Sequence, residues 1–406
     1  MTPVDRQDTG SERLSPIVRR YLVSVAVGRF GAGLTLPLTL ILLHEVRGIP
    51  LPTVGLLMSI PGVVGLAAVP VSGALVDRLG ARAVLLACLV LQASGTALLA
   101  VVGAPLSALG ALLLVGLGVG PSFPAGNALL SGLVDDRGQV RRAFGVQFTV
   151  INAALGVGTL VGAAVVDVHR AMTFEGLFLV AAASYLVQGL LLPRPERAAA
   201  DEDADPPSYR EVWGDPAFLR LCGVQLLFAM TGYAALDSGL PAYARVVGGV
   251  SPSTIALCFT VNTILIVSLQ LPVLRLAKSW RRTHALVVAA LVWSVSWALL
   301  GLTQSAWSVL VFGALFGVGE VFLAPAMQPL INSLAPERLR GRYNALSGAM
   351  FAVAFVISPS LAGVLIGNGL GWLWISGLVV GALGAALAVL RLRTGLTDEQ
   401  DGLVVA

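Results

Sequence analysis

Long apolar stretches recur along the whole chain and are separated by short polar or Pro/Gly turns. An α-helix needs about 20 consecutive apolar residues to cross the ~30 Å hydrocarbon core of a bilayer. Stretches of that length predict twelve transmembrane helices, at residues 17–44, 53–76, 81–103, 105–133, 143–166, 173–193, 216–245, 252–276, 283–303, 306–333, 343–366 and 370–392. They lack the apolar–polar alternation of strands, and an unclosed strand in lipid would leave backbone groups unpaired. The pattern therefore predicts an all-α membrane protein.

The composition agrees with a chain that lies mostly in lipid. Of the 406 residues, 56% are hydrophobic and only 12% are charged, about half of the ~25% that is usual in soluble domains. Cys88, Cys222 and Cys258 lie far apart in apolar stretches, and the three histidines have no metal-ligand spacing. We therefore expect no cofactor and no metal. We also expect no signal peptide, because residues 1–15 are polar and the first apolar stretch is too long.

Basic residues are distributed unequally between the predicted loops. If the N-terminus is cytoplasmic, all but four of the 26 Lys and Arg residues lie on the cytoplasmic side; Arg47, Arg170 and Arg245 lie opposite and Arg29 lies inside a span. This positive-inside bias predicts that both termini are cytoplasmic. It accounts for the net charge of +4 without a nucleic-acid partner. Lys278 is the only lysine, which we interpret as the mark of a GC-rich bacterial genome, so we expect a monomeric, multi-pass protein of a bacterial inner membrane.

The longest internal polar segment, residues 194–215, contains an acidic run at 201–205 followed by two prolines. It divides the chain into a six-helix bundle at residues 1–193 and a second at 216–406, which ends in a short tail. We interpret the segment as a cytoplasmic linker, with a docking site for a partner as the alternative.

The two halves resemble each other. The matching segments are 118–120 with 317–319 at an offset of 199 residues, Gly28 and Pro37 with Gly232 and Pro241 at 204, and Pro70 with Pro272 at 202. These offsets indicate an internal repeat, and they align Glu320 with Pro121 and Asp237 with Gly33. Two parallel six-helix repeats around a midplane cavity are typical of one class of secondary transporter.

A motif lies between the second and third predicted helices. Gly73, Asp77, Arg78, Gly80 and Arg82 have the spacing G-x-x-x-D-R-x-G-x-R. The motif resembles the signature of the major facilitator superfamily, although Ala81 replaces a usual basic residue. In that family the Gly allows close helix packing, and the Asp accepts from the N-terminus of the eleventh helix to latch one access state. The resemblance therefore implies a gating role for these five residues.

The fifth predicted helix contains Gly145, Gly158 and Gly162. Their spacing is similar to the signature of twelve-helix drug/proton antiporters in the same superfamily, with Thr159 in place of a Pro. Small residues at these positions are equally consistent with ordinary helix packing. The Arg that these exporters often have in their fourth helix is missing from residues 113–117, so its coupling role does not transfer.

Three charged residues lie well inside predicted spans: Arg29 in the first helix, Asp237 in the seventh and Glu320 in the tenth. Such residues cost several kcal/mol unless paired or hydrated, and are functional by default. In the resembled fold these helices line the central cavity. We predict that Glu320 loads and releases a proton, because burial favours a neutral carboxyl group, and that Arg29 pairs with Glu320 or Asp237 in one state. A static lock between the halves is the alternative.

Other residues are expected to line the cavity or its surroundings. The polar candidates are Asn127, Gln147, Asn152, Gln225, Tyr233 and Asn262, and Phe30, Phe123 and Phe322 are candidates for contact with an apolar substrate. Core packing or a helix–helix hydrogen bond is an equal alternative for each. Glu45 and Glu175 lie near span ends and are assigned no role.

The sequence thus predicts a secondary transporter that works by alternating access. The expected activity is proton-coupled efflux of a small, partly apolar molecule, either a drug or a secondary metabolite. An importer or facilitator of a small metabolite is the alternative. An enzyme is not expected, because no loop on the outer side is long enough to hold a catalytic site, and the phosphate-binding loop of a primary pump is missing.

Overall fold

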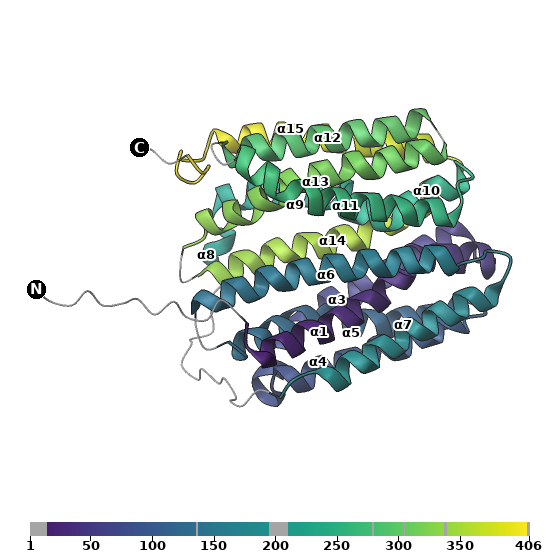
Figure 1. Cartoon of the computed structure of the whole chain (residues 1–406). Coiled ribbons are helices and arrows are strands. Elements are labelled where there is room, and N and C mark those ends of the chain that lie inside the picture. Colours follow the sequence, from purple (N-terminus) through teal and green to yellow (C-terminus); the bar gives the residue numbers. More distant parts are fainter. Residues whose placement is uncertain are drawn as a thin grey trace, which may run out of the picture.

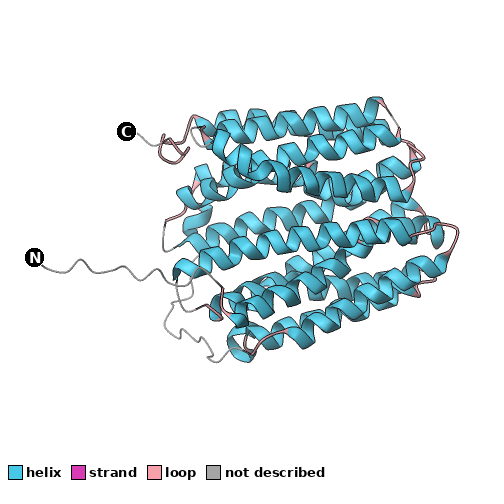
Figure 2. Ribbon diagram, in the orientation of Figure 1, coloured by secondary structure: helices cyan, strands magenta, loops and turns pink. Residues whose placement is uncertain are grey.

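The computed structural model describes residues 14–134, 137–194, 210–277, 280–303, 305–336 and 339–403. Several side chains inside these ranges lie outside the description, among them those of Gly73 and Asp77. The regular structure of the described residues is entirely helical (Figure 2). The predicted fold class is therefore confirmed. Most of the predicted linker at 194–215 lies outside the described residues.

The first half of the chain comprises α1 (Pro16–Thr35), α2 (Leu38–Ile41), η1 (Leu42–Val46), α3 (Leu51–Leu79), α4 (Ala81–Ala100), α5 (Pro105–Gly132), α6 (Arg137–Val165) and α7 (Ala171–Leu191). A short helix, α8 (Arg210–Trp213), precedes the second half. That half comprises α9 (Pro216–Thr231), η2 (Ala235–Gly239), α10 (Leu240–Val246), α11 (Pro252–Leu276), α12 (Arg282–Leu302), α13 (Ala306–Leu334), α14 (Arg340–Gly367) and α15 (Gly371–Arg393). Among the described residues, eleven segments are long and apolar enough to cross a bilayer, and the pair Pro16–Thr35 and Leu38–Val46, bent by 40°, makes a twelfth.

Local sequence explains where several of these helices begin. Ser15, Asp215 and Ser251 are N-caps whose side chains accept hydrogen bonds from backbone N–H groups of the first turn, and each is followed by a proline. Proline suits the first helical position because its missing N–H would have no partner there. Between α3 and α4 the chain turns at Gly80, whose φ of +83° is a conformation that only glycine adopts readily.

The first span of each half contains an irregular segment, at Pro37 in the first half and at Gly232 in the second. Pro37 has no N–H to donate to the carbonyl oxygen of Gly33. The Thr159 hydroxyl of α6 donates to that oxygen instead, over 3.2 Å. In the second half α9 ends at Gly232, and the π-helix η2 follows before Pro241. At the offset of 204 residues Gly232 corresponds to Gly28, which lies inside the unbroken α1, so the two breaks do not coincide in the repeat.

The two halves lie side by side, with α1–α7 in one and α9–α15 in the other (Figure 1). The start of α1 and the end of α15 lie at one end of the bundle, which we call the terminal face; the opposite end is the distal face (Figure 1). The halves meet where α3 packs against α14 and α6 against α11. Contacts lie in the distal half of α3: Gly55 faces Gly363, and the hydroxyls of Ser59 and Ser360 are 2.8 Å apart. Between α6 and α11, Gly156 faces Thr263.

Contacts inside each half correct the predicted register of the repeat. Gly118 of α5 packs against Cys88 and Gln92 of α4, whereas Gly319 of α13 packs against Ala289 and Trp293 of α12. Equivalent residues of the two halves are therefore 201 positions apart rather than 199: Gly118 and Gly319, Cys88 and Ala289, and Gln92 and Trp293. The predicted alignment of 118–120 with 317–319 is therefore wrong by two residues, because the Gly-x-Gly pattern recurs twice within α5. Glu320 corresponds to Val119, not to Pro121.

Candidate transport site

The second half contains a cluster of polar side chains around Glu320, which lies at the middle of α13. The Asn262 amide of α11 donates to the Glu320 carboxylate over 2.7 Å. Tyr233, from the break between α9 and η2, lies close enough for its hydroxyl to donate to the same group. Its ring packs against Trp293 and Phe351, with centroids 5.7 and 5.6 Å away. These residues come from five spans of the second half, so the cluster depends on the assembled half.

Asp237 belongs to the same cluster. It lies in η2, is half-buried, and is near enough to Glu320 and Tyr233 to interact with them electrostatically. No described side chain donates a hydrogen bond or forms an ion pair with it. The described part of the cluster therefore contains two carboxyl groups and neutral donors but no cation. We call Tyr233, Asp237, Asn262 and Glu320 the carboxyl cluster.

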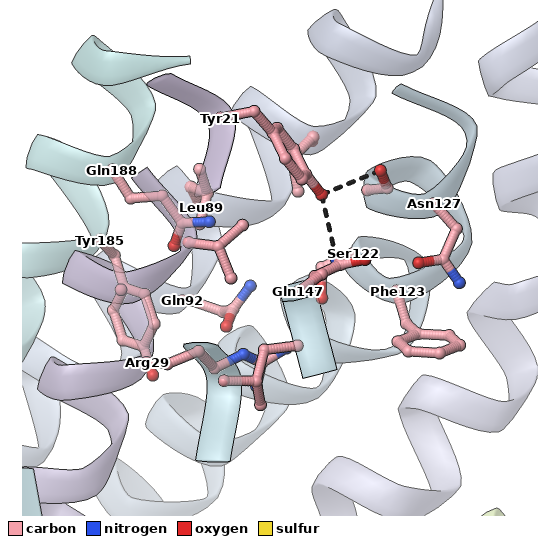
Figure 3. A pocket seen from close by; sticks show the side chains of 15 residues that line it. Tyr21, Arg29, Leu89, Gln92, Ser122, Phe123, Asn127, Gln147, Tyr185 and Gln188 are labelled. Atoms are coloured by element: carbon pink, nitrogen blue, oxygen red, sulfur yellow. Dashed lines mark hydrogen bonds between the residues drawn. The ribbon is translucent and has the colours of Figure 1, made fainter. Parts of the chain in front are cut away.

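Arg29 lies in the other half, beside a cavity of about 40 Å³ between α1, α4, α5, α6 and α7. Figure 3 shows Arg29 next to Tyr185, with Gln92 and Gln188 nearby. At the edge of the cavity the Tyr21 hydroxyl donates to the Gly126 carbonyl over 2.9 Å and accepts from Gln147 over 3.3 Å. At about 10–15 Å³ per water, the cavity has room for roughly three water molecules. We call it the Arg29 pocket.

The predicted pairing of Arg29 with Glu320 or Asp237 is not formed in this conformation. Among the described residues Arg29 has no ion-pair partner. The two carboxyl groups belong to the second half, while Arg29 faces a cavity of the first. Neither the pairing in another state nor the proton role of Glu320 is decided by this geometry, and both stay predictions.

The remaining predicted site residues have varied surroundings. Asn127 lines the Arg29 pocket, and Asn152 donates to the Phe148 carbonyl of its own helix over 2.8 Å. Phe30 is half-buried against the hydrophobic core. Gln225 is buried between α9 and α14, where its amide donates to the Ser347 carbonyl and accepts from the Ser347 hydroxyl. The structure thus places Gln225 in a helix–helix contact instead of a cavity.

The gating motif is described only in part. Arg78 is exposed, Gly80 forms the turn before α4, and Arg82 is half-buried. The surroundings of Gly73 and Asp77 lie outside the description. The predicted latch with the eleventh span, which corresponds to α14, stays a prediction.

The glycine motif of the fifth span packs α6 against α1. A Cβ atom on Gly158 would lie 2.1 Å from the Phe30 carbonyl oxygen, and one on Gly162 would lie 2.4 Å from that of Leu34. Gly145 faces open space. Two of the three motif glycines therefore allow the close helix approach that their packing interpretation predicted.

Ion pairs on the distal face were missed by the sequence analysis. Arg245 of α10 donates to both carboxylate oxygens of Glu45 in η1, over 2.6 and 2.7 Å, and so joins the two halves. Arg47 donates to Glu175 over 3.0 Å and to the Ala100 carbonyl over 2.6 Å, within the first half. The sequence could have indicated these pairs, because the few basic residues of this face lie near the same span ends as acidic residues.

Two packed six-span halves, a bent first span and charged side chains at mid-span are typical of a polytopic membrane transporter. The model of the Major Facilitator Superfamily matches residues 21–251 and 248–402. The chain therefore belongs to the major facilitator superfamily, as the sequence motif suggested.

Several transporters are similar to this chain at low sequence identity. An uncharacterized MFS-type transporter of Bacillus subtilis (strain 168), YttB, is 26% identical over 86% of this chain and 88% of its own length. A Na(+), Li(+), K(+)/H(+) antiporter of Planococcus maritimus is 24% identical over 79% of this chain and 83% of its own. The multidrug resistance protein MdtH of Enterobacter sp. (strain 638) is 27% identical over 75% of this chain and 73% of its own length.

Solved structures share the fold. The nucleoside transporter NupG superposes with a TM-score of 0.79 at 10% identity and covers 93% of this chain and 99% of its own. A D-xylose-proton symporter superposes with a TM-score of 0.74 at 12% identity, over 96% of this chain and 100% of its own. At these identities the similarity concerns the fold alone.

Proposed function

We propose that this protein is a proton-coupled secondary transporter that exports a small, partly apolar molecule by alternating access. The observation that carries the proposal is the carboxyl cluster, which has two acidic groups and, among the described residues, no cation to pair with. In the proposed orientation the terminal face is cytoplasmic and the membrane is the inner membrane of a bacterium, consistent with the basic terminal-face loops and the bacterial relatives.

Removal from water strongly favours the neutral form of a carboxyl group, and access to water favours the charged form. A carboxyl group whose access to water alternates therefore binds a proton on one side and releases it on the other. Glu320 is the first candidate for this role because it is at mid-span and is held by Asn262. Asp237 is the second candidate.

The contacts between the halves support alternating access. The glycine contact of α3 with α14 and the Glu45–Arg245 pair both lie toward the distal face. Opening this side requires that the Glu45–Arg245 pair, the small-residue contacts of α3 with α14 and the apolar contacts of α2 with α10 separate. We propose that the halves rock about the middle of these contacts, and that this structure has its distal side closed.

The direction and cargo are supported by names of relatives. The Planococcus maritimus protein is named an antiporter and the Enterobacter protein a multidrug resistance protein.

A transport assay tests the proposal. Reconstituted protein is screened against acids, bases and neutral compounds on a solid-supported membrane, with and without a pH gradient. For any compound that gives a pH-dependent current, Glu320→Gln is expected to lower that current at least about tenfold, because the substituted side chain no longer binds a proton. Asp167→Asn, in an exposed pair with Arg170 on the distal face, is the matched control. An unchanged pH-driven current in Glu320→Gln would refute the assignment.

A further inference from the structure

The Arg29 pocket has an unbalanced set of polar groups. Arg29 is its only charged lining residue, and none of the described lining residues is acidic. Three other lining side chains, those of Asn127, Tyr185 and Gln188, also have no hydrogen-bond partner among the described residues. By contrast, Tyr21 and Gln92 are already bonded to backbone carbonyl groups.

A guanidinium group inside a membrane protein is stable only with a counter-charge or good hydration. Arg29 is half-buried beside a pocket that is partly open, so water reaches the guanidinium, but none of the described lining residues provides a counter-charge. The amide groups of Asn127 and Gln188 and the Tyr185 phenol can each donate as well as accept, and none of the described lining residues is an anionic acceptor. Donors that surround a small cavity without a negative acceptor are complementary to an anion.

We propose that the Arg29 pocket binds the carboxylate group of the transported molecule, so that the cargo is an organic monocarboxylate. Arg29 would hold the two carboxylate oxygens in a bidentate pair, the geometry that a guanidinium fork favours. Figure 3 shows Phe123 and Asn127 on the side of the pocket away from Arg29. The Phe123 ring is exposed there and would contact the apolar part of the cargo.

This inference rests on the proposed function only for the statement that the ligand is the cargo. The anion and the proton would occupy different halves, with the cargo at Arg29 and the proton at the carboxyl cluster. Binding at Arg29 can therefore be measured without any gradient, and it stands or falls independently of the proton role of Glu320.

The experiment measures thermal unfolding of the purified full-length protein in detergent. Benzoate, hexanoate and indole-3-acetate are compared with benzamide, a neutral match of benzoate, and with sodium chloride at equal concentration. At about ten times the Kd, a carboxylate is expected to raise the unfolding midpoint by roughly 2–4 °C. Benzamide and chloride are expected to have no such effect.

Variants assign the site. Arg29→Gln is expected to abolish the carboxylate-dependent rise, whereas Arg170→Gln, at an exposed arginine on the distal face, is expected to retain it. Arg29→Lys keeps the charge but not the fork, and should require several-fold more carboxylate. If Arg29→Gln does not fold, the Arg29→Lys variant tests the site in its place.

Four results would overturn the proposal: no rise with any of the three carboxylates, an equal rise with benzamide, an equal rise with chloride, or a rise that persists in Arg29→Gln. The equal response to chloride would assign the pocket to an inorganic anion. The comparison of benzoate with benzamide needs no variant, and an equal rise with both overturns the proposal even if substitutions at Arg29 are not tolerated.

Discussion

At equivalent positions of the two halves, 201 residues apart, α4 has Gln92 and α12 has Trp293. Trp293 is fully buried, stacks on Phe316 at 4.5 Å and donates to the Phe316 carbonyl. Gln92 donates to the Gly118 carbonyl and lines the Arg29 pocket. One half is thus filled with aromatic rings beside the carboxyl cluster, and the other keeps a polar cavity around a cation.

This difference shows how a duplicated six-helix unit can acquire two tasks. Aromatic packing fixes the surroundings of a carboxyl group, because close-packed interiors resist rearrangement. A polar cavity leaves room for a ligand or water. We infer that the second half is the more rigid and holds the proton site, and that the first half is adapted to cargo.

The largest expected effect comes from removing the aromatic core. Trp293→Ala should destabilise the protein by about 3–5 kcal/mol, because it leaves a large cavity among buried rings. Gln92→Ala at the equivalent position should cost only about 1–2 kcal/mol, because it removes the hydrogen bonds to the carbonyl groups of Cys88 and Gly118. Denaturant or thermal unfolding in detergent measures both, and equal losses would contradict the contrast between the halves.

A smaller effect is expected at the glycine contact inside the first half. Gly158→Ala should destabilise by about 1–3 kcal/mol, because the new methyl group meets the Phe30 carbonyl and forces α1 and α6 apart. Gly145→Ala faces open space and should be neutral or slightly stabilising. If both substitutions are tolerated equally in thermal unfolding, the packing role of the motif is wrong.

The smallest expected effect concerns the ion pair that joins the halves. Glu45→Gln should shift the equilibrium away from the distal-closed state by roughly 1 kcal/mol, about fivefold, because the pair is only partly buried. The exchange Glu45→Arg with Arg245→Glu should restore it. Distances between spin labels on the distal ends of α3 and α14 report the populations. If Glu45→Gln leaves these distances unchanged, the Glu45–Arg245 pair does not hold the distal side closed.

Much of the fold could be predicted because the bilayer imposes simple rules. Apolar length alone located all twelve spans, whereas the breaks near Pro37 and Gly232, inside stretches predicted as single spans, were not predicted. The register of the repeat could not be read correctly, because Gly-x-Gly recurs two residues apart in α5 and only contacts separate the alternatives.

The site was predictable in type but not in arrangement. A charge inside a span is costly, so Arg29, Asp237 and Glu320 were identifiable from hydropathy. Which side chains surround them depends on helix rotation, which the sequence pattern does not specify. For this reason Gln225, expected near a cavity, is bonded to Ser347, and the partnership of Glu45 with Arg245 across 200 residues was missed.

The central claim is that the second half binds the proton and the first half binds the cargo. Infrared difference spectra of the reconstituted protein between acidic and alkaline pH test it directly, because a protonated carboxyl group has its own C=O stretching band. We predict a band from a carboxyl group in apolar surroundings that is lost in Glu320→Gln and retained in Arg29→Gln. A band that persists in Glu320→Gln, or disappears in Arg29→Gln, would contradict the division of tasks between the halves.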